Sequence, residues 1–153
     1  MKIISGGQTG VDTAALYTAI NLSLPYGGWV PKGRTNEDGP ISNKFTELRE
    51  ANSSDNKVRT ILNVQDADTL LVLTEGSKSS GTQLAIEEAH RLKIPVKIIV
   101  LSDCEATLAS QQIIDFLREQ KPEVLNIAGP RESEAKGICK KVQSILEDAI
   151  RGY

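Results

Sequence analysis

The chain has 153 residues, of which 39% are hydrophobic and 25% are charged, and its formal net charge is -2. This length and composition predict one soluble domain, residues 1–153, with a sizeable core. The slightly negative charge argues against binding to nucleic acid or to an anionic membrane surface, and no apolar run approaches the length of a membrane span.

The first residue and the cysteines predict the compartment. Met1 leads directly into an apolar run, so we expect no signal peptide. Cys104 and Cys139 lie far apart and lack a C-x-x-C or Cys/His neighbourhood, so no zinc site is expected and the thiols fit a reducing environment. We therefore expect a cytoplasmic protein that ligates no metal directly.

Apolar runs typical of strands alternate five times with helical patterns. The expected strands are residues 2–4, 26–30, 69–73, 95–101 and 124–128. The helices that follow them are expected at about 11–22, 55–66, 81–92, 105–119 and 138–149. The polar loop after the second strand, residues 31–43, is long enough to be functional.

This alternation predicts an α/β fold, a Rossmann-like doubly wound parallel sheet of about five strands with helices on both faces. Numbered along the chain, the strands are expected in the order 2-1-3-4-5. Ligands of such sheets bind beyond the carboxyl ends of the strands, where the strand order reverses. With the first strand beside the third, the glycine-rich turns after these two strands would flank one crevice.

The first of these turns joins the first strand to the first helix. Gly6, Gly7 and Gly10 can adopt backbone angles closed to other residues, and a helix amino terminus attracts anions. Gln8, Thr9 and Asp12 add polar groups that a bare turn does not require. The sequence of this turn matches neither the phosphate-binding loop of nucleotide triphosphatases nor the glycine motif of a dinucleotide site. The turn therefore predicts anion or nucleotide-like binding, and the alternative is a tight turn whose glycines only permit packing.

The second turn, Ser79 to Thr82, repeats this pattern before another helix. Small residues there leave the helix amides accessible, although Ser80 or Thr82 could instead act as an ordinary N-cap. A third glycine turn, residues 129–131, follows the fifth strand.

Cations near these turns could complete an anion site. Arginine matches a phosphate with a planar fork, and lysine acts as a point charge. The candidates are Lys32 and Arg34 on either side of Gly33, then Arg59 and Arg131; each could equally be a solvated surface charge. Trp29 could pack in the core or stack on a flat heterocycle.

No nucleophile–base arrangement is visible, so no catalytic residue is predicted. Three hypotheses remain open: a ligand-binding protein, an enzyme that cleaves a nucleotide-type substrate with Asp12 or Glu87 as acid/base, and a scaffold without a small ligand.

Several strings then occur together in one order: SGGQTGVD at 5–12, GGWVPKGR at 27–34, EDGPI at 37–41, RTILNV at 59–64, SGT at 80–82 and NIAGPR at 126–131. Through them, essentially the whole chain resembles the molybdenum cofactor carrier family. That family is similar in fold to the Rossmann-like proteins that include the LOG-type, "lysine decarboxylase-like" nucleotide hydrolases.

The resemblance implies a cytoplasmic homo-oligomer, a dimer or tetramer, that holds molybdopterin and protects it until transfer to a molybdoenzyme. The metal would be held by the dithiolene sulfurs of the ligand. LOG-type enzymes carry a glutamate three residues after the threonine of their Gly-Thr motif, and Ala85 stands at that position here. This departure argues against phosphoribohydrolase activity, although a nucleotide-processing enzyme or a nucleotide sensor stays an alternative.

Together, the motifs and the resemblance predict that one small phosphate-bearing ligand is bound by Gly6, Gly7, Gln8, Thr9, Gly10, Asp12, Lys32, Gly33, Arg34, Arg59, Asn63, Ser80, Gly81, Thr82 and Arg131.

Overall fold

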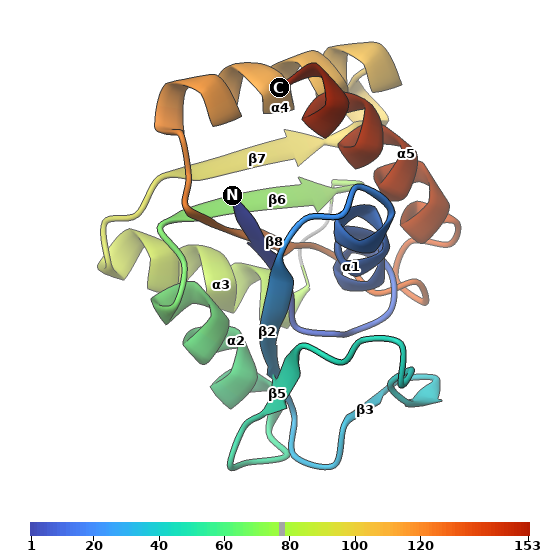
Figure 1. Cartoon of the computed structure of the whole chain (residues 1–153), viewed down its shortest axis with the longest axis vertical. Helices are drawn as coiled ribbons and strands as arrows, with labels where there is room; N and C mark the ends of the chain where they lie inside the picture. The colour runs from blue at the N-terminus through green and yellow to red at the C-terminus, as the bar shows by residue number, and fades with distance from the viewer. Residues whose placement is uncertain (77–78) are drawn as a thin grey trace.

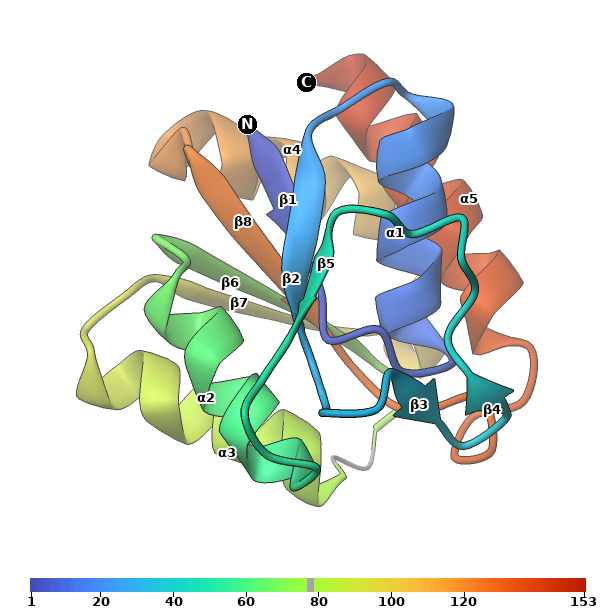
Figure 2. The same cartoon turned by 60° about the horizontal axis from the view of Figure 1, so that its bottom comes forward.

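A six-stranded parallel sheet lies between two layers of helices in the computed structural model, which describes residues 1–76 and 79–153 (Figures 1 and 2). The strands, in their spatial order, are β5 (Leu48–Glu50), β2 (Tyr26–Val30), β1 (Lys2–Ile4), β8 (Val124–Ala128), β6 (Thr69–Thr74) and β7 (Val96–Val100). The α/β Rossmann-like fold class predicted from the sequence is confirmed.

The helices divide between the two faces of the sheet, as Figure 2 shows. One face is covered by α1 (Val11–Asn21), α4 (Ala106–Gln120) and α5 (Ile138–Gly152), and the other by α2 (Asn56–Gln65) and α3 (Ser80–Arg91). A short 3-10 helix, η1 (Leu101–Asp103), follows β7. None of the helices in the described ranges combines the length and hydropathy of a membrane span.

Strand β6 shows why the sheet is covered on both faces. Its apolar side chains alternate: Leu70 and Val72 pack against α2 and α3, whereas Leu71 and Leu73 pack in the core beneath α1, α4 and α5. All four side chains are fully buried, which is typical of a central parallel strand.

The predicted strand order is wrong. Strand β8 lies between β1 and β6, with Leu125 opposite Ile3 and Ile127 opposite Leu71. The alternation of strands and helices fixes parallel pairing and crossover hand but not which strands are neighbours. A strand whose residues 125–127 are all buried belongs at the centre, where helices cover both faces. The third glycine turn therefore lies between the first two.

The loop after β2 contains two features that the sequence analysis did not predict. A two-stranded hairpin, β3 (Thr35–Asn36) and β4 (Gly39–Pro40), extends toward the first glycine turn, and β5 forms the sheet edge beyond it. Ile41, Phe45 and Leu48 of this loop bury themselves against Leu16 and Val30 in a small core of their own.

Candidate ligand-binding site

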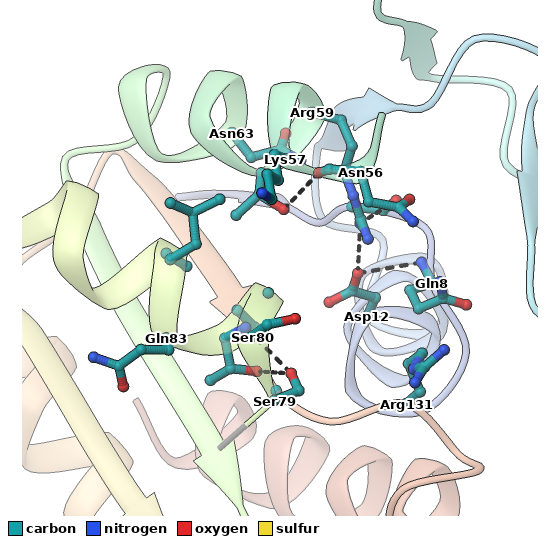
Figure 3. A pocket seen from close by; sticks show the side chains of 18 of the residues that line it. Gln8, Asp12, Asn56, Lys57, Arg59, Asn63, Ser79, Ser80, Gln83 and Arg131 are labelled. Atoms are coloured by element: carbon teal, nitrogen blue, oxygen red, sulfur yellow. Dashed lines mark hydrogen bonds and ion pairs between the residues drawn. The ribbon is translucent and has the colours of Figure 1, made fainter. Parts of the chain in front are cut away.

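A pocket of about 590 Å³ opens at the carboxyl ends of β1, β8 and β6. All three glycine turns contribute to its wall, and α2 forms the opposite side (Figure 3). Its volume falls in the range typical of small-molecule sites. The single crevice expected from the sequence therefore exists, although β8 stands where direct contact of β1 with β6 was expected.

Nine of the predicted site residues line this pocket: Gly6, Gln8, Asp12, Arg59, Asn63, Ser80, Gly81, Thr82 and Arg131. Six do not: Gly7, Thr9, Gly10, Lys32, Gly33 and Arg34. The sequence analysis did not select Lys57 and Asn56, which line the pocket from the start of α2.

The first glycine turn is satisfied by the chain itself. Its N–H groups were expected to face a ligand, yet four of them donate to nearby oxygens: Gly7 to Ser5 Oγ (3.3 Å), Gln8 to Asp12 Oδ2 (3.2 Å), Thr9 to Gln8 Oε1 (3.0 Å) and Val11 to the Pro130 carbonyl (3.2 Å). This turn therefore presents few free donors to the pocket.

The glycines of this turn are required by internal packing. A Cβ at Gly6 would overlap Arg59 Nη1, and one at Gly10 would overlap the Pro130 carbonyl oxygen. Gly7 has a positive φ of 71°, and its Cβ would lie 2.7 Å from Val30 Cγ1. The packing alternative left open by the sequence thus describes these three positions.

Asp12 and Arg59 form an ion pair on the pocket wall, with 3.2 Å between Arg59 Nη1 and Asp12 Oδ2. Their side chains are only 10% and 11% exposed. Burial raises the pKa of the Asp12 carboxyl group, against the lowering effects of the Arg59 charge and the Gln8 and Gly6 amides. Arg59 Nη1 also donates to the Gly6 carbonyl at 2.8 Å, whereas its buried Nε has no acceptor among the described residues.

The second glycine turn is open where the first is filled. Ser79, rather than Ser80 or Thr82, is the N-cap of α3: its Oγ accepts from the Thr82 N–H at 3.2 Å and lies 3.0 Å from Thr82 Oγ1. A Cβ at Gly81 would meet no atom within 4 Å. Within residues 1–76 and 79–153, the N–H groups of Ser80 and Gly81 contact no acceptor, so they remain available at the pocket.

Arg131, from the third turn, is 47% exposed and held by two carboxylates. Its Nε donates to Glu134 Oε1 at 3.0 Å, and its Nη1 lies 3.6 Å from Glu37 Oε2. Glu37, at the tip of the β3–β4 hairpin, also accepts from the Ser133 hydroxyl, the Thr9 hydroxyl and the Ser133 N–H, and these donors lower its pKa. The motif at 37–41 contains Glu37, but nothing in the local sequence marks its partners.

Three of the predicted residues stabilise the loop after β2 instead. The Arg34 guanidinium donates to the carbonyl oxygens of Phe45 (3.2 Å) and Leu48 (3.4 Å). The Gly33 N–H donates to Glu50 Oε1 at 2.7 Å, and the Lys32 N–H donates to the Ser53 carbonyl at 2.9 Å.

Two further groups considered as ligand contacts are engaged within the fold. Asn63 is 3% exposed and its amide pairs with the Trp29 backbone, which joins α2 to β2. The Trp29 ring is covered by the Arg49 guanidinium, 4.4 Å from the ring centroid, and its Nε1 donates to Asp66. Trp29 lies outside the pocket wall, so stacking on a pocket ligand is not supported.

In the described parts of the chain, no cluster of His, Cys, Asp or Glu side chains could hold a metal ion. The fold is that of a Rossmann-like α/β protein, with a candidate ligand pocket at the carboxyl edge of its sheet. A family model described as "Circularly permutated YpsA SLOG family" matches residues 3–150, and the chain belongs to this family. No curated protein matches it.

A solved structure agrees with this assignment. The crystal structure at 1.45 Å of a protein named "Putative molybdenum carrier protein", from Syntrophus aciditrophicus SB, superposes with a TM-score of 0.93. The two sequences are 40% identical over 97% of this chain and 94% of that one. The family resemblance seen in the sequence motifs is therefore confirmed.

Proposed function

We propose that this protein is a carrier that binds the molybdenum cofactor, a phosphate-bearing pterin, in the pocket and does not transform it. The observation that carries the proposal is the open amino terminus of α3 at Gly81, which faces a pocket of suitable volume. The Syntrophus protein is named a molybdenum carrier, which supports a molybdenum-containing ligand, and the pterin follows from the family resemblance of the sequence motifs.

The phosphate would bind at the N–H groups of Ser80 and Gly81. A helix amino terminus carries partial positive charge and stabilises an exposed anion by about 0.3–1 kcal/mol. That alone is weak, so cationic side chains must contribute as well. Arg59 retains a buried Nε without an acceptor among the described residues, and the side chains of Lys57 and Arg131 reach the same pocket.

A graded substitution at Gly81 tests this site. A Cβ there meets no protein atom, so Gly81→Ala and Gly81→Val should both fold. The larger valine side chain should cover the N–H groups at the amino terminus of α3. Isothermal titration calorimetry would compare neopterin monophosphate with neopterin. We expect the wild type to bind the phosphate ester at least about tenfold more tightly, an advantage worth about 1.4 kcal/mol that Gly81→Val removes.

Equal affinity of the wild type for both forms would contradict the proposal. Ser144→Val, on the exposed face of α5, is the matched control for adding a β-branched side chain to a helix, and it should leave both affinities unchanged. Incubation with nucleoside monophosphates should release no free base; release that is lost in Asp12→Asn would favour a nucleotide-cleaving enzyme instead.

The wider proposal follows the family resemblance. The carrier would be a cytoplasmic homo-oligomer that transfers its ligand to a molybdoenzyme. Light scattering on the purified chain measures the oligomeric state, and reconstitution of an apo-molybdoenzyme by the loaded protein measures transfer.

A further inference from the structure

We infer that Asp12 makes the pocket selective for organic phosphate esters that present an N–H or O–H donor away from the phosphate, and that it disfavours bare oxyanions. This inference rests on the proposed function, because it assigns the second end of the same ligand. It separates a pterin or nucleotide from phosphate or molybdate.

The two carboxylate oxygens of Asp12 have different surroundings. Oδ2 accepts the Gln8 N–H and the Arg59 Nη1–H, each at 3.2 Å. Oδ1 accepts neither of these hydrogen bonds, and the Gly6 amide is a further donor near the carboxylate. Oδ1 is not among the enclosed unpaired side-chain atoms of the described residues, which are Thr18 Oγ1 and Arg59 Nε. Figure 3 shows this second oxygen directed into the pocket, toward the side where Ser80 lies.

Two N–H donors at Oδ2, one of them cationic, favour the ionised, accepting form of the Asp12 carboxyl group and oppose the rise in its pKa that burial causes. The Asp12 side chain is only 10% exposed, so its carboxylate stays at the pocket wall and does not turn out into bulk water. A ligand that reaches Oδ1 must therefore supply a proton donor, or it leaves a buried acceptor unpaired.

Bare oxyanions fail this requirement. Phosphate and molybdate present mainly acceptor oxygens near neutral pH, and at this end of the pocket they would meet a second negative charge. The 2-amino-4-oxopyrimidine edge shared by pterins and guanine carries N–H donors, and ribose carries O–H donors. The amino terminus of α3 accepts the anion and Asp12 accepts the donor, so the two ends of the pocket recognise opposite chemistry.

Calorimetry with guanosine 5′-monophosphate tests the inference. The probes are this nucleotide, its analogues that each lack one donor (inosine, 1-methylguanosine, 2′-deoxy and 3′-deoxy monophosphates), inorganic phosphate and molybdate. In the wild type, removal of one particular donor should weaken binding about 10- to 100-fold, the range for a hydrogen bond to a charged group. In Asp12→Asn, removal of the same donor should have little effect, while phosphate binds as well as before or better.

Asp12→Asn is nearly isosteric and keeps an oxygen for Gln8 and Arg59, and a thermal melt checks that it folds. Asp148→Asn, an exposed carboxylate on α5, should reproduce every wild-type affinity. Donor deletions that act equally in the wild type and Asp12→Asn overturn the inference, as does molybdate binding the wild type as tightly as the nucleotide. The proposed function fails by a different result, equal binding of phosphorylated and dephosphorylated neopterin.

Discussion

The first and second glycine turns have similar composition and both follow a parallel strand, but their backbone N–H groups are used differently. At residues 6–10, side chains and carbonyl groups of the protein fill the space beside each glycine and accept the backbone N–H groups. At residues 79–82, the cap is supplied by Ser79 and the space beside Gly81 is empty. Both turns line the pocket, but only the second leaves N–H groups without an acceptor among the described residues.

This difference shows that a glycine-rich turn does not by itself leave its backbone N–H groups unused. The carboxylate of Asp12 occupies the position at the first turn that an external anion would take, and Arg59 neutralises it. The substitutions below break or sharpen this contrast, beginning with the largest expected effect.

Arg59→Met should be the most damaging change. It leaves the Asp12 carboxylate buried without its cation, and breaking a buried ion pair in this way costs about 3–5 kcal/mol of unfolding free energy. Urea denaturation measures this loss. Because the two side chains are in contact, the double variant Arg59→Met with Asp12→Asn should lose less than the sum of the single changes. Strict additivity would show that the pair does not stabilise the first turn.

The glycines themselves should differ next. Gly10→Ala forces a Cβ into the Pro130 carbonyl at a φ of 75°, so we expect a loss of about 2–3 kcal/mol in unfolding free energy. Gly81→Ala meets no atom and should change stability by less than about 1 kcal/mol, with stabilisation the expected sign. Parallel urea titrations compare them. A comparable loss in both would erase the distinction between the turns.

The sequence predicted the parts of this molecule that depend on local pattern. The strands expected at 26–30 and 124–128 coincide with β2 and β8, because apolar runs between helical segments specify them directly. The order of the strands could not be predicted in this way. It depends on which strands are covered by helices on both faces, and the apolar pattern of β8 is compatible with either a central or an outer position. Only the buried run at Leu125 and Ile127, seen in place, separates the two.

The candidate site shows the same division. An accessible helix start at residues 80–82 follows from small residues before a helical pattern, and the structure has it. The contacts that Arg59 and Glu37 make with the first glycine turn and its surroundings could not be predicted, because their partners lie 28 to 96 residues away in sequence. A charged residue in a loop reveals its charge locally, but its partner depends on the assembled fold.

Ser79→Ala should weaken the second turn alone. It removes the oxygen that accepts the Thr82 N–H, and loss of such an N-cap costs about 1 kcal/mol. The midpoint of urea unfolding should fall accordingly. Amide hydrogen exchange should quicken in the first turn of α3 and stay unchanged in α1; faster exchange at both helix starts would contradict the independence of the two turns.

Glu37→Gln gives the smallest effect and tests whether the β3–β4 hairpin braces the first turn. Glu37 accepts hydrogen bonds from Ser133 and Thr9 and forms an ion pair with Arg131, and these contacts lower its pKa below that of the unfolded chain. Its ionised form therefore stabilises the fold above the unfolded pKa, and that stabilisation disappears as pH falls through the lower, folded pKa. At pH 7 the variant should lose about 1 kcal/mol of unfolding free energy, the usual contribution of such hydrogen bonds.

At pH values below the folded pKa, where Glu37 is protonated, the wild type and the variant should become equally stable, and urea titrations across this range measure the convergence. A difference that stays constant with pH would show that the carboxylate charge does not brace the turn.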